Sequence, residues 1–441
     1  MASLDYDDIQ GILLQERPEK YVGMYLLLQI DDPKSGRSVL KKLLPEITSA
    51  NRWEKPSDGA WVNGALTYKG LEKLGVPKES LESFPAEFRE GMSSRAEKLG
   101  DYNESAPENW EDYFEEERLH LAIAIFSPDE ERLKEALDRA RKVYDELDGI
   151  TLLYELSVSS PENGLSHMGF TEGISNPAIE GNELHPPLKG ETPLKAGEFI
   201  IGKENEKGNI EEGPTPNILG NNGSYMALRK IHLRVAAFRS YLHEKGETDE
   251  ERELLAAKMV GRWPSGTPLS LSPDKDDPKL ALDENVRNDF LYKDDPKGLK
   301  CPLSSHVRRA NPRDSLEDSI ADVNIHRLLR RSTMYGPPLP EGELADDGED
   351  RGLIFAGICT SLSRQYEFIK STWLNDGNFI ELSEEDPITG NKAGEGMYTI
   401  PEEPFRKRMH GIPAFSVTKG GSYFFIPSIS ALKWISELGE K

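Results

Sequence analysis

The sequence predicts an α+β protein made of two similar halves, and three observations lead to this prediction. In the first half, apolar strand-like runs alternate with segments of helical periodicity. A stretch rich in proline, glycine and charge at 181–222 then interrupts the alternation, as linkers do. After it, the same alternation returns. We therefore expect an N-terminal domain over residues 1–180, a linker or crossing loop over 181–219 and a C-terminal domain over 220–441.

The first half contains strand-like runs at 20–30, 61–68, 120–126 and 150–158. Its clearest helix is predicted over 129–147, where apolar side chains recur at helical spacing: Leu133, Ala136, Leu137, Ala140, Tyr144 and Leu147. Ser127 and Glu130, on either side of Pro128, predict a capping box at its start. A helix with one apolar face is expected to cover a sheet.

The second half contains strand-like runs at 224–233, 351–362 and 420–427. Each is followed by a helix-like segment, at 235–246, 364–374 and 428–439. Between them, the Asp- and Pro-rich stretch 270–298 is typical of a long insertion, of the kind that covers another part of a fold.

Composition excludes several classes of function. The formal net charge of -24 argues against nucleic acid or an anionic membrane as a partner, because a polyanion would be repelled. Cys301 and Cys359 lie far apart without metal-ligand spacing, so we expect free, buried thiols. Acidic residues follow the initial Met where a signal peptide needs bases, and no apolar run reaches membrane-spanning length. We expect a cytoplasmic protein.

The stretch GFTEGISNP, at 169–177, isolates one carboxylate. Glu172 lies between Gly169 and Gly173, just after the strand-like run 150–158. Such an acid could work in a site, or it could be a turn residue that ends a strand and caps a helix. This motif alone does not decide between them.

The stretch CPLSSHVRRANPRDS places His306 beside Arg308, Arg309 and Arg313. Nearby cations disfavour imidazolium, so a neutral ring able to ligate a metal is chemically reasonable. The arginines could bind carboxylates or phosphates of a bound group. Alternatively, they could pair with the protein's own carboxylates.

Two further stretches carry charged residues at fixed places. In NIHRLLRRSTMYG, Arg327, Arg330 and Arg331 share a short apolar and basic segment, although arginines at a helix end would look the same. In EEDPITG, Pro387 holds Asp386 in an extended conformation, where a carboxylate can orient a histidine. A turn-forming Asp is the alternative.

Taken in order, these motifs resemble the dye-decolorizing peroxidases, a haem enzyme family. The resemblance rests on GFTEG with SNP, GRWPSGTPL, HVRRANPR, LLRRSTMYG, RGLIFAG, EEDPITG and GGSYFFIPSISALKW. It extends to the start, through DDIQGILL and LTYKGLEKLGV, and is closest to the larger members without an export signal.

The resemblance implies a duplicated ferredoxin-like fold with two four-stranded antiparallel sheets, peripheral helices and haem b held mainly by the C-terminal half, one per chain. It makes His306 the proximal iron ligand and Arg313 the partner of a haem propionate. Asp386 would accept the other ring N–H of His306, although Glu384 and Glu385 stand beside it.

On the opposite haem face, Arg330 matches the distal arginine of the family, and Leu353 and Phe355 match apolar residues of the distal pocket. The distal acid of the family is an aspartate in a GxxDG motif. Here Glu172 replaces it, which keeps the carboxylate and adds one methylene. Gly173, with Gly169, is expected to let the backbone lie close to the porphyrin.

The expected function is a peroxidase that uses hydrogen peroxide to oxidise dyes, phenolics and similar small aromatic donors through a ferryl intermediate. Glu172 would move the proton and Arg330 would stabilise developing negative charge. A haem-binding or haem-transfer protein with weak peroxidase activity is the alternative, and a structural α+β protein without a cofactor is a third. The sequence leaves open the reductant, the surface Tyr or Trp relay and whether the chain forms a homo-oligomer.

Overall fold

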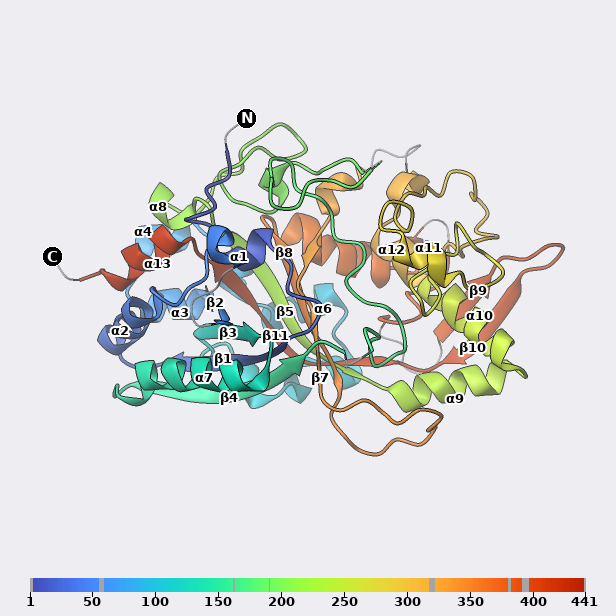
Figure 1. Cartoon of the computed structure of the whole chain (residues 1–441), viewed down its shortest axis with the longest axis horizontal. Helices are drawn as coiled ribbons and strands as arrows, with labels where there is room; N and C mark the ends of the chain where they lie inside the picture. Colours follow the sequence, from blue (N-terminus) through green and yellow to red (C-terminus); the bar gives the residue numbers. More distant parts are fainter. Residues whose placement is uncertain are drawn as a thin grey trace.

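The computed structural model describes residues 3–54, 59–161, 163–189, 191–316, 322–379, 382–390 and 396–439. In Figure 1, the N-terminal strands and the helices α2, α7 and α13 occupy one end of the long axis. The helices α9 to α12 and the β9–β10 hairpin occupy the other end. The first end includes elements of both halves of the sequence, because α13 is the last helix of the chain and lies beside α2.

The strands are β1 (Val22–Ile30), β2 (Trp61–Leu66), β3 (Leu121–Ser127), β4 (Ile150–Ser159), β5 (Ser224–Leu233), β6 (Leu329–Arg330), β7 (Thr333–Tyr335), β8 (Gly352–Cys359), β9 (Gly396–Ile400), β10 (Lys407–Ile412) and β11 (Ser416–Ile426). The predicted strand runs of both halves are all present. The hairpin of β9 and β10 and the short strands β6 and β7 were not predicted.

The helices are α1 (Gly11–Leu14), α2 (Pro33–Leu43), α3 (Tyr68–Lys73), α4 (Lys78–Glu82), α5 (Ala86–Glu90), α6 (Ala96–Leu99), α7 (Glu130–Asp145), α8 (Asn217–Gly220), α9 (Val235–Lys245), α10 (Asp249–Val260), α11 (Pro278–Leu282), α12 (His306–Ala310) and α13 (Ile429–Ser436). The predicted helix at 364–374 is wound as π-helix, in η10 (Ser363–Glu367) and η11 (Ile369–Leu374). No helix in the described ranges has both the length and the apolar character needed to cross a membrane.

In the described residues, β9 and β10 form a separate two-stranded sheet, and the other nine strands form one sheet that closes on itself. Its order in the described residues is β5-β11-β2-β3-β1-β4-β7-β8-β6, and an additional pairing of β5 with β8 completes the ring. The N-terminal strands β2, β3, β1 and β4 are consecutive in it, and every pairing is antiparallel. The α+β fold with antiparallel sheets is confirmed.

Strands from the N-terminal half pair with strands from the C-terminal half at two places in this sheet, which we call seams. Phe425 of β11 pairs with Leu66 of β2, and Ser159 of β4 pairs with Met334 of β7. The hydrogen-bonded ring therefore includes both halves. The boundaries 1–180, 181–219 and 220–441 stay a prediction, with β4 ending at Ser159 and β5 beginning at Ser224.

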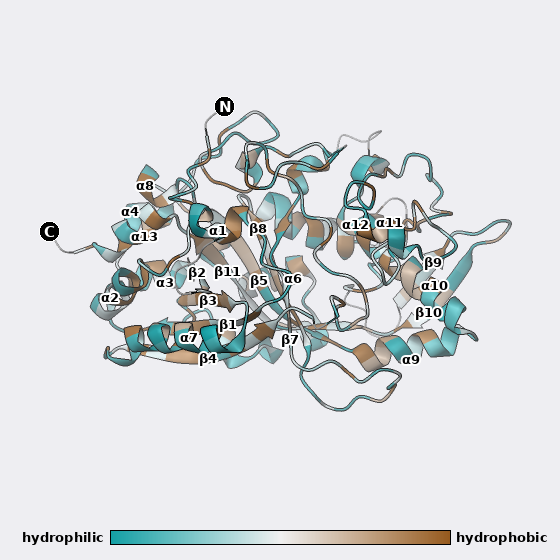
Figure 2. Cartoon of the chain, in the orientation of Figure 1, coloured by the Kyte–Doolittle hydropathy of each residue, from teal (hydrophilic) through white to brown (hydrophobic). Residues whose placement is uncertain are grey.

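Strand β1 shows how the core is divided. Leu26 and Leu28 belong to a cluster that includes the buried faces of α2 and α7, whereas Tyr25 and Leu27 belong to a second cluster. Side chains of a strand alternate between the two faces of a sheet, so β1 contributes to both cores. Figure 2 shows hydrophobic colour on the strands and hydrophilic colour on much of α7.

Helix α7 buries the predicted apolar face, since Leu133, Ala136, Leu137, Ala140 and Tyr144 are all buried. The predicted capping box of Ser127 and Glu130 is wrong. Asp129 is the N-cap, and its carboxylate accepts a hydrogen bond from the Arg132 backbone N–H at 2.9 Å. Ser127 is instead the last residue of β3, where its backbone is already paired in the sheet.

Candidate active site

A cavity of about 250 Å³ lies between the two halves of the chain. Its lining comes from the loop after β4, from strands β5, β8 and β11, and from α12 and η11. The lining includes several of the residues predicted from sequence motifs: Glu172, His306, Arg313, Arg330, Leu353 and Phe355. Segments far apart in the sequence thus meet at one cavity.

His306 is the first residue of α12, and it faces the cavity with a partly exposed ring. Its Nδ1 lies 2.9 Å from Oδ2 of Asp386, so a ring with a proton on Nδ1 donates to that carboxylate. Burial alone would lower the pKa of His306, but the charge and hydrogen bond of Asp386 outweigh it and the pKa is raised. This arrangement leaves Nε2 as the ring atom available to a metal.

Asp386 is fully buried beside His306. Its Oδ1 accepts hydrogen bonds from the backbone N–H groups of Ile388 and Thr389, at 2.9 and 2.7 Å. Burial would raise the pKa of Asp386, but its bonds to His306 and Thr389 hold the pKa well below the usual range. The carboxylate is therefore ionised and fixed, as an orienting partner must be.

Glu172 lies in the distal loop, a name we use for residues 171–176. Thr171 anchors this loop, because its backbone N–H and its hydroxyl both donate to the Pro264 carbonyl, at 3.0 and 2.9 Å. The Glu172 side chain is exposed to the open space of the cavity, and protein atoms surround that space. Burial raises the pKa of Glu172, and Arg330, His306 and a hydrogen bond with Ser166 offset the rise only in part.

The glycines around Glu172 adopt left-handed backbone conformations, with φ of +85° at Gly169 and +76° at Gly173. A Cβ there would be strained by the backbone conformation. Apart from the glycine itself and its two neighbours in the chain, no heavy atom of the described residues lies within 4 Å of a Cβ built at either position. The expectation that a porphyrin needs these glycines for close approach stays a prediction.

Arg330 ends strand β6, next to β8. Its Nη2 donates to the Ser175 hydroxyl and its backbone N–H to Oδ1 of Asn176, both at 2.9 Å. Arg331 points elsewhere, with Nε donating to the Ile12 carbonyl at 2.9 Å. Arg330 lines the cavity, whereas Arg331, just beyond the end of β6, is not among the residues that line it.

Further guanidinium groups line the cavity, from Arg262, Arg313 and Arg327. Burial lowers the pKa of Arg262 and of Arg327 to about 10, and the charges of Arg313 and Arg330 add to the effect. Arg313 has a left-handed backbone with φ of +51°, a conformation that costs a non-glycine residue about 1 kcal/mol. Such a concentration of positive charge suits a ligand with carboxylates.

Sequence reasoning missed Arg262 and left Arg327 without a role. The signal for Arg262 was its position in GRWPSGTPL, a motif otherwise used only for the resemblance. Of the arginines near His306, Arg308 and Arg309 do not line the cavity. Arg308 pairs with Asp295 at 3.2 Å, and Arg309 donates to the carbonyls of Trp373 and Glu384.

The apolar wall of the cavity comes mainly from strands. Leu353 and Phe355 are two residues apart on β8 and so share one face, and Leu353 pairs across the sheet with Ile231 of β5. Val307, Ile369 and Leu374 add apolar surface from α12 and η11. A flat apolar group with charged substituents at one edge matches this lining.

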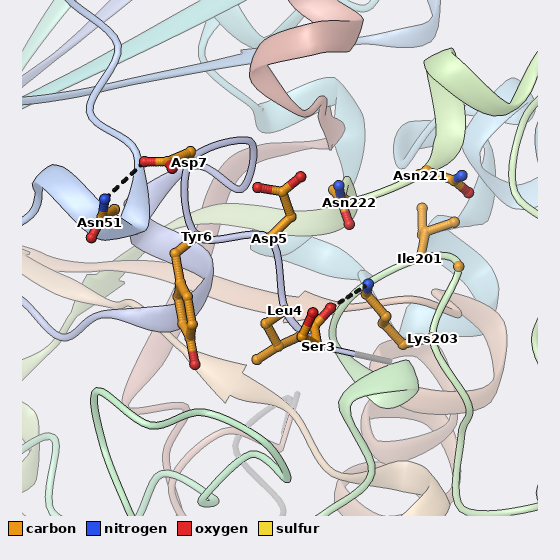
Figure 3. Close-up of a pocket in the computed structure, with 11 residues that line it drawn as sticks. Ser3, Leu4, Asp5, Tyr6, Asp7, Asn51, Ile201, Lys203, Asn221 and Asn222 are labelled. Carbon is orange, nitrogen blue, oxygen red and sulfur yellow. Dashed lines mark hydrogen bonds between the residues drawn. The ribbon is translucent and has the colours of Figure 1, made fainter. Parts of the chain in front are cut away.

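A second cavity, of about 550 Å³, lies near the N-terminal segment (Figure 3). Asp7 accepts a hydrogen bond from Asn51 there, and Lys203 donates to the Ser3 carbonyl. Its lining holds no residue of the sequence motifs around Glu172, His306 or Arg330.

The cavity with His306 fits a haem. Within the described ranges, no three His, Cys, Asp or Glu side chains are grouped so that they could hold a metal ion by themselves. An iron bound by Nε2 of His306 would therefore need most of its ligands from a macrocycle. The apolar wall and the arginines offer contacts for the ring and for its propionates.

Comparison with known proteins gives the family. The chain is 30% identical to a dye-decolorizing peroxidase of Mycena epipterygia, over 98% of this chain and 87% of that protein. The chain belongs to the dye-decolorizing peroxidase family. The DyP dimeric alpha+beta barrel domain matches residues 8–160, and another dye-decolorizing peroxidase, of Auricularia auricula-judae, is also 30% identical over 98% of the chain.

Solved dye-decolorizing peroxidases have the same fold. One in complex with 2,6-dimethoxyphenol has a TM-score of 0.87 at 29% identity, over 98% of this chain and 100% of that one. Another, with an engineered haem pocket, has a TM-score of 0.86 at 28% identity. This protein is therefore a DyP-type peroxidase, an oxidoreductase of a haem enzyme family.

Proposed function

We propose that this DyP-type peroxidase binds one haem b, held by His306, and uses hydrogen peroxide to oxidise dyes, phenolics and similar one-electron donors. The observation that carries the proposal is the meeting of Glu172, Arg330 and His306 at one cavity. The charge of Arg330 lowers the pKa of His306 and that of Glu172 raises it, which supports a shared site.

His306 would be the proximal ligand, with Asp386 fixing the ring and making it a stronger donor to iron. Arg313 would bind a propionate, and Arg262 and Arg327 extend the same positive region. Leu353 and Phe355 would limit the space above the ring, and Gly173 would turn the chain after Glu172. When bound, haem would supply the redox chemistry that peroxide and the reducing substrates require.

Glu172 would accept a proton from one oxygen of hydrogen peroxide and return it to the other, which leaves as water. Arg330 would stabilise the negative charge that develops on the departing oxygen. Burial raises the pKa of Glu172, which brings the acid closer to the strength that a reversible proton carrier needs. Glutamate in place of the aspartate expected from the family motif is compatible with this role.

The test of haem ligation is replacement of His306 by Ala, with His243→Ala as the control. His243 is exposed on α9, away from the cavity. We expect His306→Ala to lose haem or peroxidase turnover, while His243→Ala keeps both. Unchanged haem content and turnover in His306→Ala would refute the assignment.

The second candidate is a haem-binding or haem-transfer protein with weak peroxidase activity. The observation that favours it is Glu172 itself, since its longer side chain changes the reach of the carboxylate. Peroxide consumption by the haem-loaded protein separates the two functions. If the parent consumes peroxide no faster than Glu172→Gln does, a haem-binding or haem-transfer function is favoured over the peroxidase.

A further inference from the structure

The insertion at 270–298 lies against the cavity, and Asn288 is the residue through which it meets the distal loop. Asn288 does not line the cavity, so it would not touch haem or peroxide directly. Its side-chain amide contacts both the distal loop and Arg262, and its backbone carbonyl contacts Arg313. These contacts link regions that the proposed function assigns to different tasks.

On one side, Asn288 holds the distal loop. Its Nδ2 donates to the Ile174 carbonyl at 2.5 Å, two residues beyond Glu172. The loop also rests on the turn at 261–269, where a Cβ built at Gly266 would lie 2.8 Å from Cδ1 of Ile174. The path of the backbone that carries Glu172 is therefore set from outside the loop.

On the other side, Asn288 holds two cavity arginines. Nη2 of Arg262 donates to Oδ1 of Asn288 at 2.8 Å, and Nη1 of Arg313 donates to the Asn288 carbonyl at 3.0 Å. The ring of Phe290 lies 3.9 Å below the Arg313 guanidinium and 5.5 Å from that of Arg262. The arginines are thus fixed by the same segment that fixes the distal loop.

We propose that Asn288 is a positioning residue that places Glu172 relative to the arginines Arg262 and Arg313. This inference rests on the proposed function, in which Glu172 moves the proton, Arg313 binds a propionate and Arg262 extends the same positive region. A side-chain amide is suited to this task because it donates to Ile174 and accepts from Arg262 at the same time.

Asn288→Asp separates the two contacts. The carboxylate still accepts from Arg262, but it cannot donate to the Ile174 carbonyl and repels it instead. The hydrogen bond with Arg262 is therefore kept, and the hydrogen bond with the Ile174 carbonyl is lost. Asn288→Ala removes both contacts without adding charge. Asn285→Asp is the control, since Asn285 is exposed in the same insertion and its side chain accepts a hydrogen bond from the Lys189 backbone, which a carboxylate can also accept.

The readouts are the rate of peroxide consumption and the rate of cyanide binding to the haem-loaded protein. Cyanide enters as the neutral acid and must give its proton to a base, so its binding reports on Glu172 without turnover. Transfer of haem to apomyoglobin reports on the arginine side. Each variant is made in the parent and in Glu172→Gln, which forms a double-mutant cycle.

We expect Asn288→Asp to slow both rates by about tenfold, the effect of losing a well-placed hydrogen bond to a catalytic loop. In the Glu172→Gln background, the same change should alter both rates by less than about twofold, because the two residues act as one unit. Haem transfer should stay within about threefold of the parent, and Asn285→Asp should match the parent throughout.

Equal slowing by Asn288→Asp in both backgrounds would overturn the inference, as would no slowing in the parent. If Asn288→Asp does not load haem, Asn288→Ala takes its place in the same cycle with the same criteria. A Glu172→Gln variant that reacts like the parent would overturn the proposed role of Glu172 instead, so the two failures are distinguishable.

Discussion

Arg330 donates a hydrogen bond from Nη2 to the hydroxyl of Ser175, at 2.9 Å. Ser175 lies three residues beyond Glu172, in the same distal loop. The backbone N–H of Arg330 also donates to Asn176 of that loop. One loop therefore carries the acid and orients the cation, so the two groups keep a fixed relation to each other.

The first prediction concerns this contact. Ser175→Ala removes the acceptor of Nη2, so Arg330 can turn away from the cavity, and the peroxide step should slow by about tenfold. The rate of peroxide consumption by the haem-loaded protein is the measurement. Ser240→Ala, on the exposed side of α9, is the control. A rate equal to that of the parent would show that Arg330 needs no orienting partner.

The second prediction concerns Asp386. Asp386→Asn keeps the shape but removes the charge that faces Nδ1 of His306, so the ring becomes a weaker ligand. We expect haem to dissociate about 10- to 100-fold faster, as found when partners of metal-bound histidines are removed. Transfer of haem to apomyoglobin measures this rate, with exposed Asp274→Asn as the control. Unchanged dissociation would contradict the account of this pair.

The third prediction is the pH dependence of the peroxide step. Glu172 must be ionised to accept a proton, and its pKa is raised above the usual 4.5 by burial. The rate should therefore be full at high pH and fall as the pH drops through a value above 4.5. The rate of Glu172→Gln should not show this fall at low pH, whereas the rate of Glu172→Asp should still show a fall. A parent profile that is flat down to pH 4 would contradict the prediction.

The fourth prediction concerns stability. Glu367 is fully buried and accepts hydrogen bonds from Arg95 and Tyr423, with Lys98 at 2.8 Å. Burial would raise the pKa of Glu367, but these partners outweigh it and lower the pKa. Glu367→Gln should reduce the free energy of unfolding at pH 7 by about 2 to 3 kcal/mol, somewhat less than for a fully buried pair because Lys98 is partly exposed.

The sign of the pH effect follows from the lowered pKa. The Glu367 contribution is present above the unfolded pKa of about 4.3 and is lost as the pH falls through the folded value. The difference between parent and Glu367→Gln should therefore shrink below about pH 4. Denaturant unfolding at pH 7 and in acid measures it. If the free energy of unfolding differs between parent and Glu367→Gln by the same amount at pH 7 and in acid, the charge of Glu367 does not cause the difference.

Local patterns predicted much of the fold. Alternation and helical spacing located the main strands and helix α7, because burial on one face imposes those periods. The ring was not predictable in this way, since its seams at Phe425 with Leu66 and Ser159 with Met334 join residues distant in sequence. The predicted cap of α7 was wrong because Ser127 and Asp129 are both residue types that cap helices. Ser127 belongs to strand β3, and Asp129 caps the helix.

Residues of the candidate site could be predicted where they belong to a recognisable sequence motif. Asp386 could be placed beside His306 from EEDPITG, and the structure shows this contact. Arg262 and Asn288 could not be chosen in the same way. Asn288 contacts Ile174 and Arg262, which are distant from it in sequence. A local sequence pattern does not predict such contacts.

The central claim is that Glu172 moves the proton in peroxide activation. The most direct test is stopped-flow absorption of the haem-loaded protein mixed with one equivalent of hydrogen peroxide, for the parent and for Glu172→Gln. The account predicts a rapid change in the haem spectrum of the parent and one at least about 100-fold slower in the variant. Equal rates in both proteins, or a spectrum that does not change in either, would contradict it.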